Sequence, residues 1–239
     1  MLYYQQMKYH VSFDLDFKRN PYKGKFIVLE GMDGSGKTVQ AQLLAQNLTI
    51  QGKKAHSASS GQVVYLTKNP TDSEIGKFIR KALQGKVEVP LVSFQYLFSA
   101  DRQIQQLEVI EHLERGEIVI SDRYFWSSVA YGVADKQGVD YKNVANFGLI
   151  VYSALSMYHQ FIVPDFTFYL DVSVKTGLMR RHDSAKEKEL YENTEKMERI
   201  EKGYKWLLQE FPKEFTIIDG EKSIEDVQEN LLRSLTKIF

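Results

Sequence analysis

Five short apolar runs recur along the chain from Lys25 onward, and segments with helical patterns separate them. The runs are continuously apolar rather than alternating, which is typical of strands buried on both faces. Strands that alternate with helices predict a parallel sheet with right-handed crossovers. The expected strands are Phe26–Glu30, Val63–Thr67, Ile118–Asp122, Thr167–Asp171 and Thr216–Asp219. We therefore expect a three-layer α/β fold, with a five-stranded parallel sheet and helices on both faces.

The expected helices lie between and after these strands. They span Thr38–Leu48, Ser73–Leu83, Leu91–Arg115, Ser127–Val133, Val144–His159, Val174–His182, Glu192–Glu210 and Ile224–Ile238. Glycine is favoured just past a helix end, and Gly52, Gly85 and Gly116 stand at three such places. We interpret residues 53–62 as a surface loop. Residues 1–23 show no clear periodicity, so we expect an N-terminal extension ahead of a domain that spans residues 24–239.

The chain has 239 residues, a size typical of one domain, and its 31 basic and 31 acidic side chains balance. A zero net charge without a basic stripe argues against a nucleic-acid partner. The sequence has no Cys, which excludes disulfides, thiolate metal sites and cysteine nucleophiles. The longest apolar stretch, residues 147–158, is interrupted and too short to cross a bilayer. We therefore expect a cytoplasmic protein with no membrane partner.

A glycine-rich segment follows the first expected strand. Its residues, Gly31-Met32-Asp33-Gly34-Ser35-Gly36-Lys37-Thr38, match the P-loop pattern. In a P-loop the backbone N–H groups point at phosphate oxygens, the lysine bridges the beta and gamma phosphates, and the next hydroxyl is a ligand of Mg²⁺. The alternative is an ordinary glycine-rich turn, but the strand before the motif and the helix after it favour the P-loop. We expect a P-loop NTPase fold that binds ATP on residues 31–38, with Lys37 as a catalytic group.

A carboxylate and a guanidinium follow the third expected strand, in Asp122-Arg123-Tyr124. Ligands of parallel sheets bind beyond the carboxyl ends of the strands, where the P-loop also lies. Arg123 would clamp the phosphate of an acceptor and offset charge as the phosphoryl group moves. Asp122 would order Mg²⁺ together with Thr38. Asp122 and Arg123 also fit a structural ion pair, and these two residues alone do not decide between the two interpretations.

Phe98 and Arg102 stand four residues apart in an expected helix, so they share a face. An aromatic ring beside a fixed donor suits a nucleobase. An arginine donor favours the O4 acceptor of thymine or uracil over the amino group that cytosine carries at that place. The alternative is that Phe98 belongs to the core and Arg102 to a solvated helix face.

Together these segments resemble the thymidylate kinase family. The P-loop, Thr67–Pro70, Leu97–Arg102, Asp122–Tyr131 and Pro164–Asp171 occur in that family's order and spacing, over residues 25–239. The resemblance implies a nucleoside monophosphate kinase fold that transfers the gamma-phosphoryl group of ATP to dTMP with Mg²⁺. It also implies a homodimer.

The resemblance further implies roles for single residues. Phe98 would stack on thymine, Arg102 would bond its O4 and Ser128 would reach the edge of the base. The other positions implied to contact dTMP are Arg123 and Lys68 at its phosphate, Asp33 near its sugar, and Tyr131 where a ribose 2′-hydroxyl would need space.

The chain departs from the family pattern in two places. Lys68 stands where the family often has arginine, and lysine offers a point charge rather than a bidentate fork. We interpret residues 180–192 as a lid. The resemblance implies a catalytic arginine there in an Asp-Arg-x-Glu setting, but the nearest match, Glu189-Leu190-Tyr191-Glu192, lacks that arginine. Arg181 and Lys188 are the cations we predict to replace it over the phosphates. The alternative is a solvated helix surface, because both signs of charge are dense in this segment.

The leading hypothesis from the sequence is therefore a dTMP kinase that yields dTDP and ADP. Alternatives are a kinase for another pyrimidine nucleotide or a deoxynucleoside, and a noncatalytic nucleotide-binding regulator. Arg123 favours a phosphorylated acceptor. The joint presence of Lys37, Thr38, Asp122 and Arg123 favours an enzyme.

Overall fold

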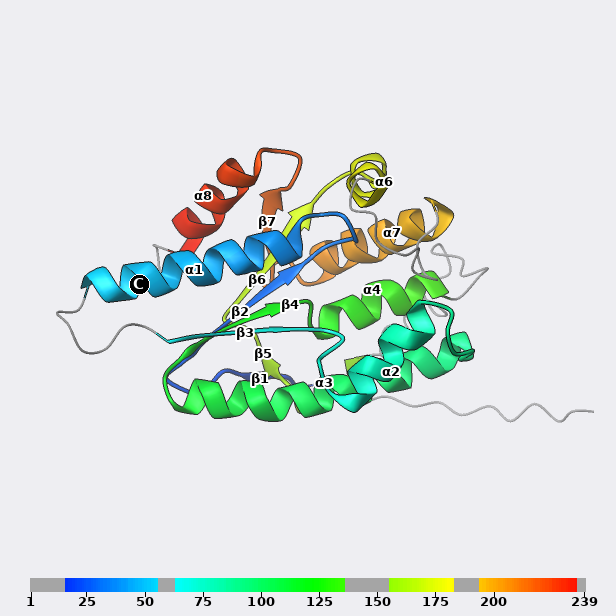
Figure 1. Ribbon diagram of the computed structural model, residues 1–239, viewed down its shortest axis with the longest axis horizontal. Helices are drawn as coiled ribbons and strands as arrows, with labels where there is room; N and C mark the ends of the chain where they lie inside the picture. The colour runs from blue at the N-terminus through cyan, green and yellow to red at the C-terminus, as the bar shows by residue number, and fades with distance from the viewer. Residues whose placement is uncertain (1–15, 56–62, 136–154, 183–193, 236–239) are drawn as a thin grey trace, which may run out of the picture.

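The computed structural model describes residues 16–55, 63–135, 155–182 and 194–235. These residues contain a five-stranded sheet in the order β3-β4-β2-β6-β7, in which every neighbouring pair is parallel (Figure 1). Its strands are β2 (Lys25–Glu30), β3 (Val64–Lys68), β4 (Ile118–Asp122), β6 (Phe166–Asp171) and β7 (Thr216–Asp219). The expected sheet is confirmed, and the strand that precedes the P-loop motif lies at its centre.

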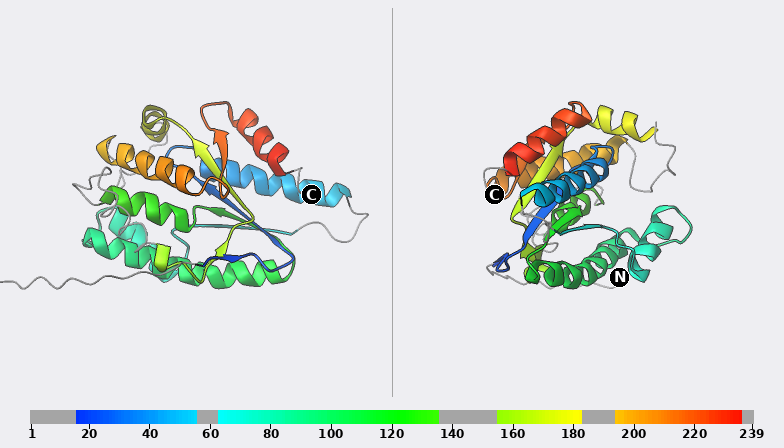
Figure 2. Two further views of the ribbon diagram at one scale, coloured as in Figure 1. Left: turned by 180° about the vertical axis from the view of Figure 1, so that it is seen from behind. Right: turned by 60° about the vertical axis from the view of Figure 1, so that its left-hand side comes forward.

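Helices cover both faces of this sheet, as Figures 1 and 2 show. On one face lie α1 (Lys37–Ala55) and α8 (Ile224–Leu235), and on the other lie α3 (Leu91–Glu114), α4 (Phe125–Asp135) and α7 (Thr194–Glu210). Two shorter helices complete the described set: α2 (Glu74–Leu83) packs on α3, and α6 (Val174–His182) packs on α7. The predicted three-layer arrangement is confirmed.

The central strand β2 explains why the apolar runs are continuous. Phe26 and Val28 pack into the cluster formed with α3, α4 and α7, whereas Ile27 and Leu29 pack into the cluster formed with α1 and α8. All four side chains are fully buried. Because both faces of the strand are covered by helices, all four positions from Phe26 to Leu29 are apolar.

Two details of the helices differ from the prediction or lie beyond it. The helix α1 continues through Gly52 to Ala55, so the loop predicted for residues 53–62 is wrong over residues 53–55. A single glycine costs a helix only about 1 kcal/mol, and the lysines and alanine that follow favour continuation. Gly85 and Gly116 do end helices, with φ of 71° and 81°. The helix predicted for residues 144–159 lies mostly outside the described residues.

A second, two-stranded parallel sheet joins β1 (Lys18–Arg19) to β5 (Ile162–Val163). The sequence did not predict it, because two-residue strands are too short to show a pattern. Next to it the ring of Phe17 stacks on Phe125, with centroids 5.8 Å apart. Part of the segment that we expected as an extension thus contacts the domain, and residues 1–15 lie outside the described residues.

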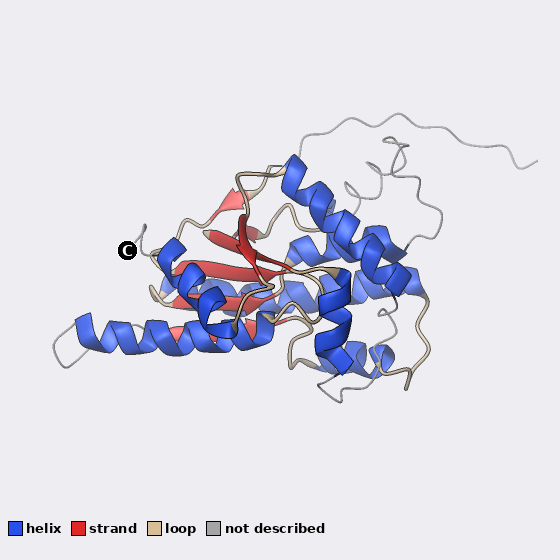
Figure 3. Ribbon diagram, turned by 90° about the horizontal axis from the view of Figure 1, so that it is seen from above, coloured by secondary structure: helices blue, strands red, loops and turns tan. Residues whose placement is uncertain are grey.

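The topology directs attention to one edge of the main sheet. From β2 the chain moves first to β3 and β4 on one side, and later to β6 and β7 on the other. Such a change of direction leaves a crevice at the carboxyl ends of the central strands. Figure 3 shows these strands with the helices around them. Within the described part of the chain, no helix is long and apolar enough to cross a membrane.

Candidate active site

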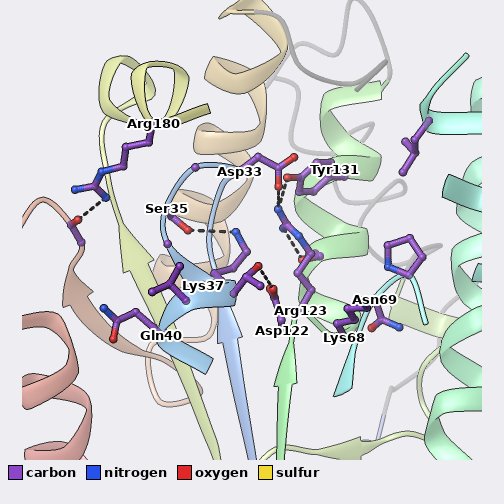
Figure 4. Close-up of a pocket in the computed structure, with 18 of the residues that line it drawn as sticks. Asp33, Ser35, Lys37, Gln40, Lys68, Asn69, Asp122, Arg123, Tyr131 and Arg180 are labelled. Carbon is purple, nitrogen blue, oxygen red and sulfur yellow. Dashed lines mark hydrogen bonds and ion pairs between the residues drawn. The ribbon is translucent and has the colours of Figure 1, made fainter. Parts of the chain in front are cut away.

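A cavity of about 880 Å³ opens at the carboxyl ends of β2, β3 and β4. Its size falls in the range of small-molecule sites. The cavity brings together nearly all the predicted site residues that the structure describes (Figure 4). Those that line it are Asp33, Gly34, Ser35, Gly36, Lys37, Thr38, Lys68, Phe98, Arg102, Asp122, Arg123, Ser128 and Tyr131.

The P-loop joins β2 to α1 and has no room for a side chain at Gly34. The φ of this residue is 78°, a conformation that favours glycine. A Cβ atom there would lie 2.2 Å from the carbonyl oxygen of Gly177 in α6. Gly31 and Met32 do not themselves line the cavity: their carbonyl groups accept bonds from Arg123 and Lys37. The loop therefore packs closely against α6, and the side chains of Lys37 and Arg123 hold it by hydrogen bonds.

Lys37 extends from the first turn of α1 under the P-loop (Figure 4). Its Nζ donates to the carbonyl of Met32 at 2.7 Å and to Oγ of Ser35 at 3.2 Å. Burial, reinforced by the nearby charge of Arg123, lowers the pKa of Lys37 to about 8. The charges of Asp122, Asp33 and Glu30 act in the opposite direction, but no carboxylate of the described residues forms an ion pair with Lys37. A phosphate group at the loop would stabilise this buried cation.

Arg123 lies directly after β4, and its φ of 72° is unusual for a residue with a side chain. Holding such a conformation costs of order 1–3 kcal/mol and is typical of functional sites. The guanidinium faces five acceptors: Asp33, the hydroxyl of Tyr131 at 2.8 Å, the carbonyl of Gly31 at 3.0 Å, Oγ of Ser127 at 3.1 Å and the hydroxyl of Tyr204 at 3.4 Å. Arg123 therefore connects the P-loop with α4 and α7.

A buried carboxylate holds the groups that surround this arginine. Glu30, at the end of β2, accepts from the backbone N–H of Tyr124 at 2.9 Å, from Oγ of Ser127 at 2.6 Å and from the hydroxyl of Tyr204 at 2.8 Å. Burial, together with the charge of Glu30, raises the pKa of Tyr204, so this hydroxyl keeps its proton and donates. Glu30 thus fixes two of the groups that surround Arg123.

Two oxygen groups meet beside the P-loop, because Oγ1 of Thr38 donates to the carboxylate of Asp122. Oxygen atoms of this kind are the ligands that Mg²⁺ prefers, and Mg²⁺ usually takes only one or two from a protein. The pair therefore fits the predicted metal site. Lys68, at the end of β3, is half-exposed at the cavity wall, and its Nζ lies 3.7 Å from Asp72.

Phe98, Arg102 and Ser128 form the far wall of the cavity. Arg102 is only 2% exposed, and its Nη1 donates to Oγ of Ser128 at 2.6 Å. Its Cζ lies 5.4 Å from the centre of the Phe98 ring. The alternative in which Arg102 belongs to a solvated helix face is wrong, because α4 covers it. An aromatic ring and a fixed donor do share one wall, as the spacing predicts.

Comparison with known proteins shows which family this chain belongs to. The family model described as thymidylate kinase matches residues 29–231. The chain belongs to the thymidylate kinase family. A probable thymidylate kinase of Methanococcus aeolicus is 35% identical over 216 residues, which cover 88% of this chain and 95% of the relative. One of Pyrococcus horikoshii is 36% identical with the same coverage. The solved thymidylate kinase of Candida albicans matches with a TM-score of 0.72 and 25% identity, over 90% of this chain and 92% of that chain.

Sequence reasoning missed several residues of this thymidylate kinase family site. Arg80 of α2 lines the cavity and donates to the carbonyl of Pro70 at 2.9 Å and to Asp72 at 3.1 Å. An arginine on a short amphipathic helix gives no signal of its own, because its position depends on how α2 lies on α3. Glu30 did give a signal that we did not use, since a carboxylate follows four apolar residues at the end of β2.

The opposite end of the cavity is formed by the loop of residues 220–224. Arg180 of α6 donates to the carbonyl of Gly220 at 2.9 Å (Figure 4). Nε2 of Gln40 donates to the carbonyl of Ile224 at 2.9 Å. Two helices therefore hold this loop from opposite ends. Neither residue was predicted, because both interactions depend on tertiary contacts of α1 and α6.

The predicted lid falls largely outside the described residues. Arg181 belongs to the last turn of α6, and Lys188 lies in residues 183–193, which the structure does not describe. The replacement of the missing lid arginine by Arg181 or Lys188 stays a prediction.

Proposed function

We propose that this chain transfers the gamma-phosphoryl group of ATP to dTMP, giving dTDP and ADP. The observation that carries the proposal is the cavity itself, in which a P-loop with its lysine shares one space with a second arginine and an aromatic wall. Membership of the thymidylate kinase family supports the same activity. Donor and acceptor phosphates would meet between Lys37 and Arg123.

The chain's own groups supply positioning and positive charge. The P-loop N–H groups and Lys37 hold the phosphates of ATP, and Arg123 holds the phosphate of the acceptor for in-line transfer. The attacking oxygen belongs to a phosphate that is already ionised near pH 7, so the reaction needs no strong general base. Thr38 and Asp122 would hold Mg²⁺, which, when bound, offsets the charge of the phosphates.

The remaining residues are assigned by their place in the cavity. Phe98 would stack on the base, Arg102 would bond its O4 and Ser128 would lie at its edge. Lys68 would add charge beside the acceptor phosphate, Asp33 would approach the sugar, and Tyr131 would occupy the space of a 2′-hydroxyl. Arg180 and the loop 220–224 would hold the adenine end of ATP, and Arg181 or Lys188 would close over the phosphates.

The test is ADP release by the purified protein with ATP, Mg²⁺ and, separately, dTMP, dUMP, UMP, dCMP and thymidine. We expect fast turnover with dTMP. Tight binding of ATP without turnover of any acceptor would instead identify a regulator. Preference for thymidine would identify a nucleoside kinase.

The lowered pKa of Lys37 predicts a pH dependence. A lysine whose pKa is about 8 loses its charge as the pH rises through 8, whereas an ordinary lysine stays charged to about pH 10. We expect kcat/KM for ATP, which reports the free enzyme, to fall above about pH 8. A profile of kcat/KM between about pH 7 and about pH 10 measures it, with the melting temperature as the control for folding. A profile that stays flat throughout would contradict the prediction.

We further propose a homodimer through α3. Tyr96 and Leu107 on this helix are 66% and 65% exposed, and Ile104 lies on the same face. Exposed apolar side chains gathered on one helix are typical of an interface. Light scattering should give twice the 27.7 kDa mass of one chain, and the mass of a single chain would contradict the dimer. The proposal also locates the enzyme in the cytoplasm, with ATP and dTMP as its partners and neither nucleic acid nor membrane.

A further inference from the structure

A chain of hydrogen bonds runs away from the cavity behind Ser128. Oγ of Ser128 lies 2.7 Å from the hydroxyl of Tyr158, which lies 2.7 Å from Oγ of Ser99. Oγ of Ser99 lies 2.7 Å from the backbone carbonyl of Gln95, one helical turn earlier in α3. At the cavity end, Nη1 of Arg102 contacts Ser128 at 2.6 Å. Among the described residues that line the cavity, Tyr158 and Ser99 are not found.

The two ends of this hydrogen-bond network fix the direction in which each hydroxyl group donates its proton. A backbone carbonyl only accepts, so the single proton of Ser99 goes to Gln95. The contact between Tyr158 and Ser99 then needs the proton of Tyr158, and the contact between Ser128 and Tyr158 needs the proton of Ser128. Arginine only donates, which agrees with this direction at the cavity end. These proton positions are assigned from the hydrogen-bond network.

The assignment determines what Ser128 offers to a base. Its proton is committed to Tyr158, and one lone pair of Oγ is taken by Arg102, so the remaining lone pair can only accept. Arg102 can still donate through the rest of its guanidinium, since among the described residues the acceptor that it meets is Oγ of Ser128. Arg102 and Ser128 therefore present one donor and one acceptor side by side.

A pyrimidine with a keto group at C4 matches this pair, because its O4 accepts and its N3–H donates. Cytosine mismatches both positions, since it carries an amino donor at C4 and an acceptor at N3. We propose that Tyr158 sets the specificity of the acceptor site: it holds the Ser128 hydroxyl as an acceptor, so that the site rejects pyrimidines with an amino group at C4. The inference rests on the proposed function, because it takes the cavity wall as the site of the acceptor base.

The geometry around Tyr158 suits this positioning role. The residue is fully buried, and its ring packs against Phe125 and Phe161, with centroids 5.8 Å and 5.1 Å away. The ring also lies 6.0 Å from Cζ of Arg102. A phenylalanine would keep these ring contacts and remove only the hydroxyl. The effect of the proton direction can thus be separated from the effect of packing.

The experiment measures dissociation constants for dTMP, dUMP and dCMP by calorimetry, and kcat/KM for the same nucleotides with ATP. In Tyr158→Phe the Ser128 proton is released and can turn toward N3 of cytosine. Arg102 still opposes the amino group, so we expect the preference for dTMP over dCMP to fall by about tenfold rather than to vanish. The preference for dTMP over dUMP should not change, because these bases share the same O4 and N3–H.

Ser99→Ala extends the test to a residue one bond farther from the cavity. Without Ser99, the proton of Tyr158 can turn to Ser128 and release the Ser128 proton, so we expect the same change of selectivity with the tyrosine in place. Tyr65→Phe is the matched control, because it removes a tyrosine hydroxyl, bonded to Glu108, that lies outside this hydrogen-bond network. Its selectivity should equal that of the wild type.

The two proposals fail in different ways. Absence of dTMP turnover in the wild type contradicts the kinase, while the dissociation constants still decide the role of Tyr158. A wild type that binds dTMP and dCMP equally, or binds neither, overturns the inference. A Tyr158→Phe variant that keeps the wild-type preference for dTMP over dCMP also overturns it. The same holds for a variant whose preference for dTMP over dUMP changes as well.

Discussion

Replacing Lys37 by alanine is expected to lower kcat by about 10³-fold or more while the protein stays folded. Lys37 is the cation in contact with the P-loop carbonyl of Met32, and it would bridge the phosphates of ATP. Its loss removes charge where the phosphoryl group moves. Steady-state ADP release with saturating ATP and dTMP measures the effect.

The stability of the same variant separates this role from a structural one. Folding lowers the pKa of Lys37 from 10.5 to about 8, so below pH 8 the fold bears the cost of the buried charge. At pH 7 the alanine variant should therefore melt no lower than the wild type. Lys37→Met, which keeps the volume of the stem, controls for the cavity left by alanine. Turnover near the wild-type rate in either variant would refute the P-loop assignment.

The second large effect is expected at Arg123. Removing its guanidinium should lower kcat/KM for dTMP by about 10² to 10³-fold, since a bidentate clamp on the acceptor phosphate is lost. The dissociation constant for ATP should change much less. Calorimetry for each nucleotide and steady-state kinetics measure the two effects separately.

The choice of variant at Arg123 follows from its backbone. Glycine adopts a φ of 72° at little cost, so Arg123→Gly relieves strain of about 1 kcal/mol that Arg123→Ala retains. Arg123→Lys keeps the charge but loses the fork, and it should recover only part of the activity. If the glycine variant binds and phosphorylates dTMP like the wild type, Arg123 is a structural residue and the proposed acceptor site is wrong.

The fold was predictable where the local sequence pattern reflects how a segment is buried in the tertiary structure. The apolar run of β2 is continuous because helices cover both of its faces, and the same holds for β4. The sheet β1–β5 was not predictable, because two residues carry no period and their pairing depends on segments far apart in the sequence. The end of α1 was misplaced because Gly52 favours a helix end only weakly.

The residues of the site also fall into two groups, those that the sequence alone located and those that it did not. Lys37, Thr38 and Arg123 belong to short motifs whose spacing fixes their position relative to a strand end, so the sequence alone located them. Tyr158 and Tyr204 belong to no motif. Both look like core aromatics from the sequence, and their hydroxyl groups matter only because other elements bring Ser128 and Glu30 to them.

The close contact between Gly34 and Gly177 limits where catalytic charge can come from. With the carbonyl oxygen of Gly177 only 2.2 Å from the place of a Cβ, residue 34 cannot carry a cationic side chain unless α6 moves. A cationic substitution at Gly34 is therefore not a way to accelerate phosphoryl transfer. Any further positive charge has to reach the phosphates from another element, and its benefit depends on the position of that element when both nucleotides are bound.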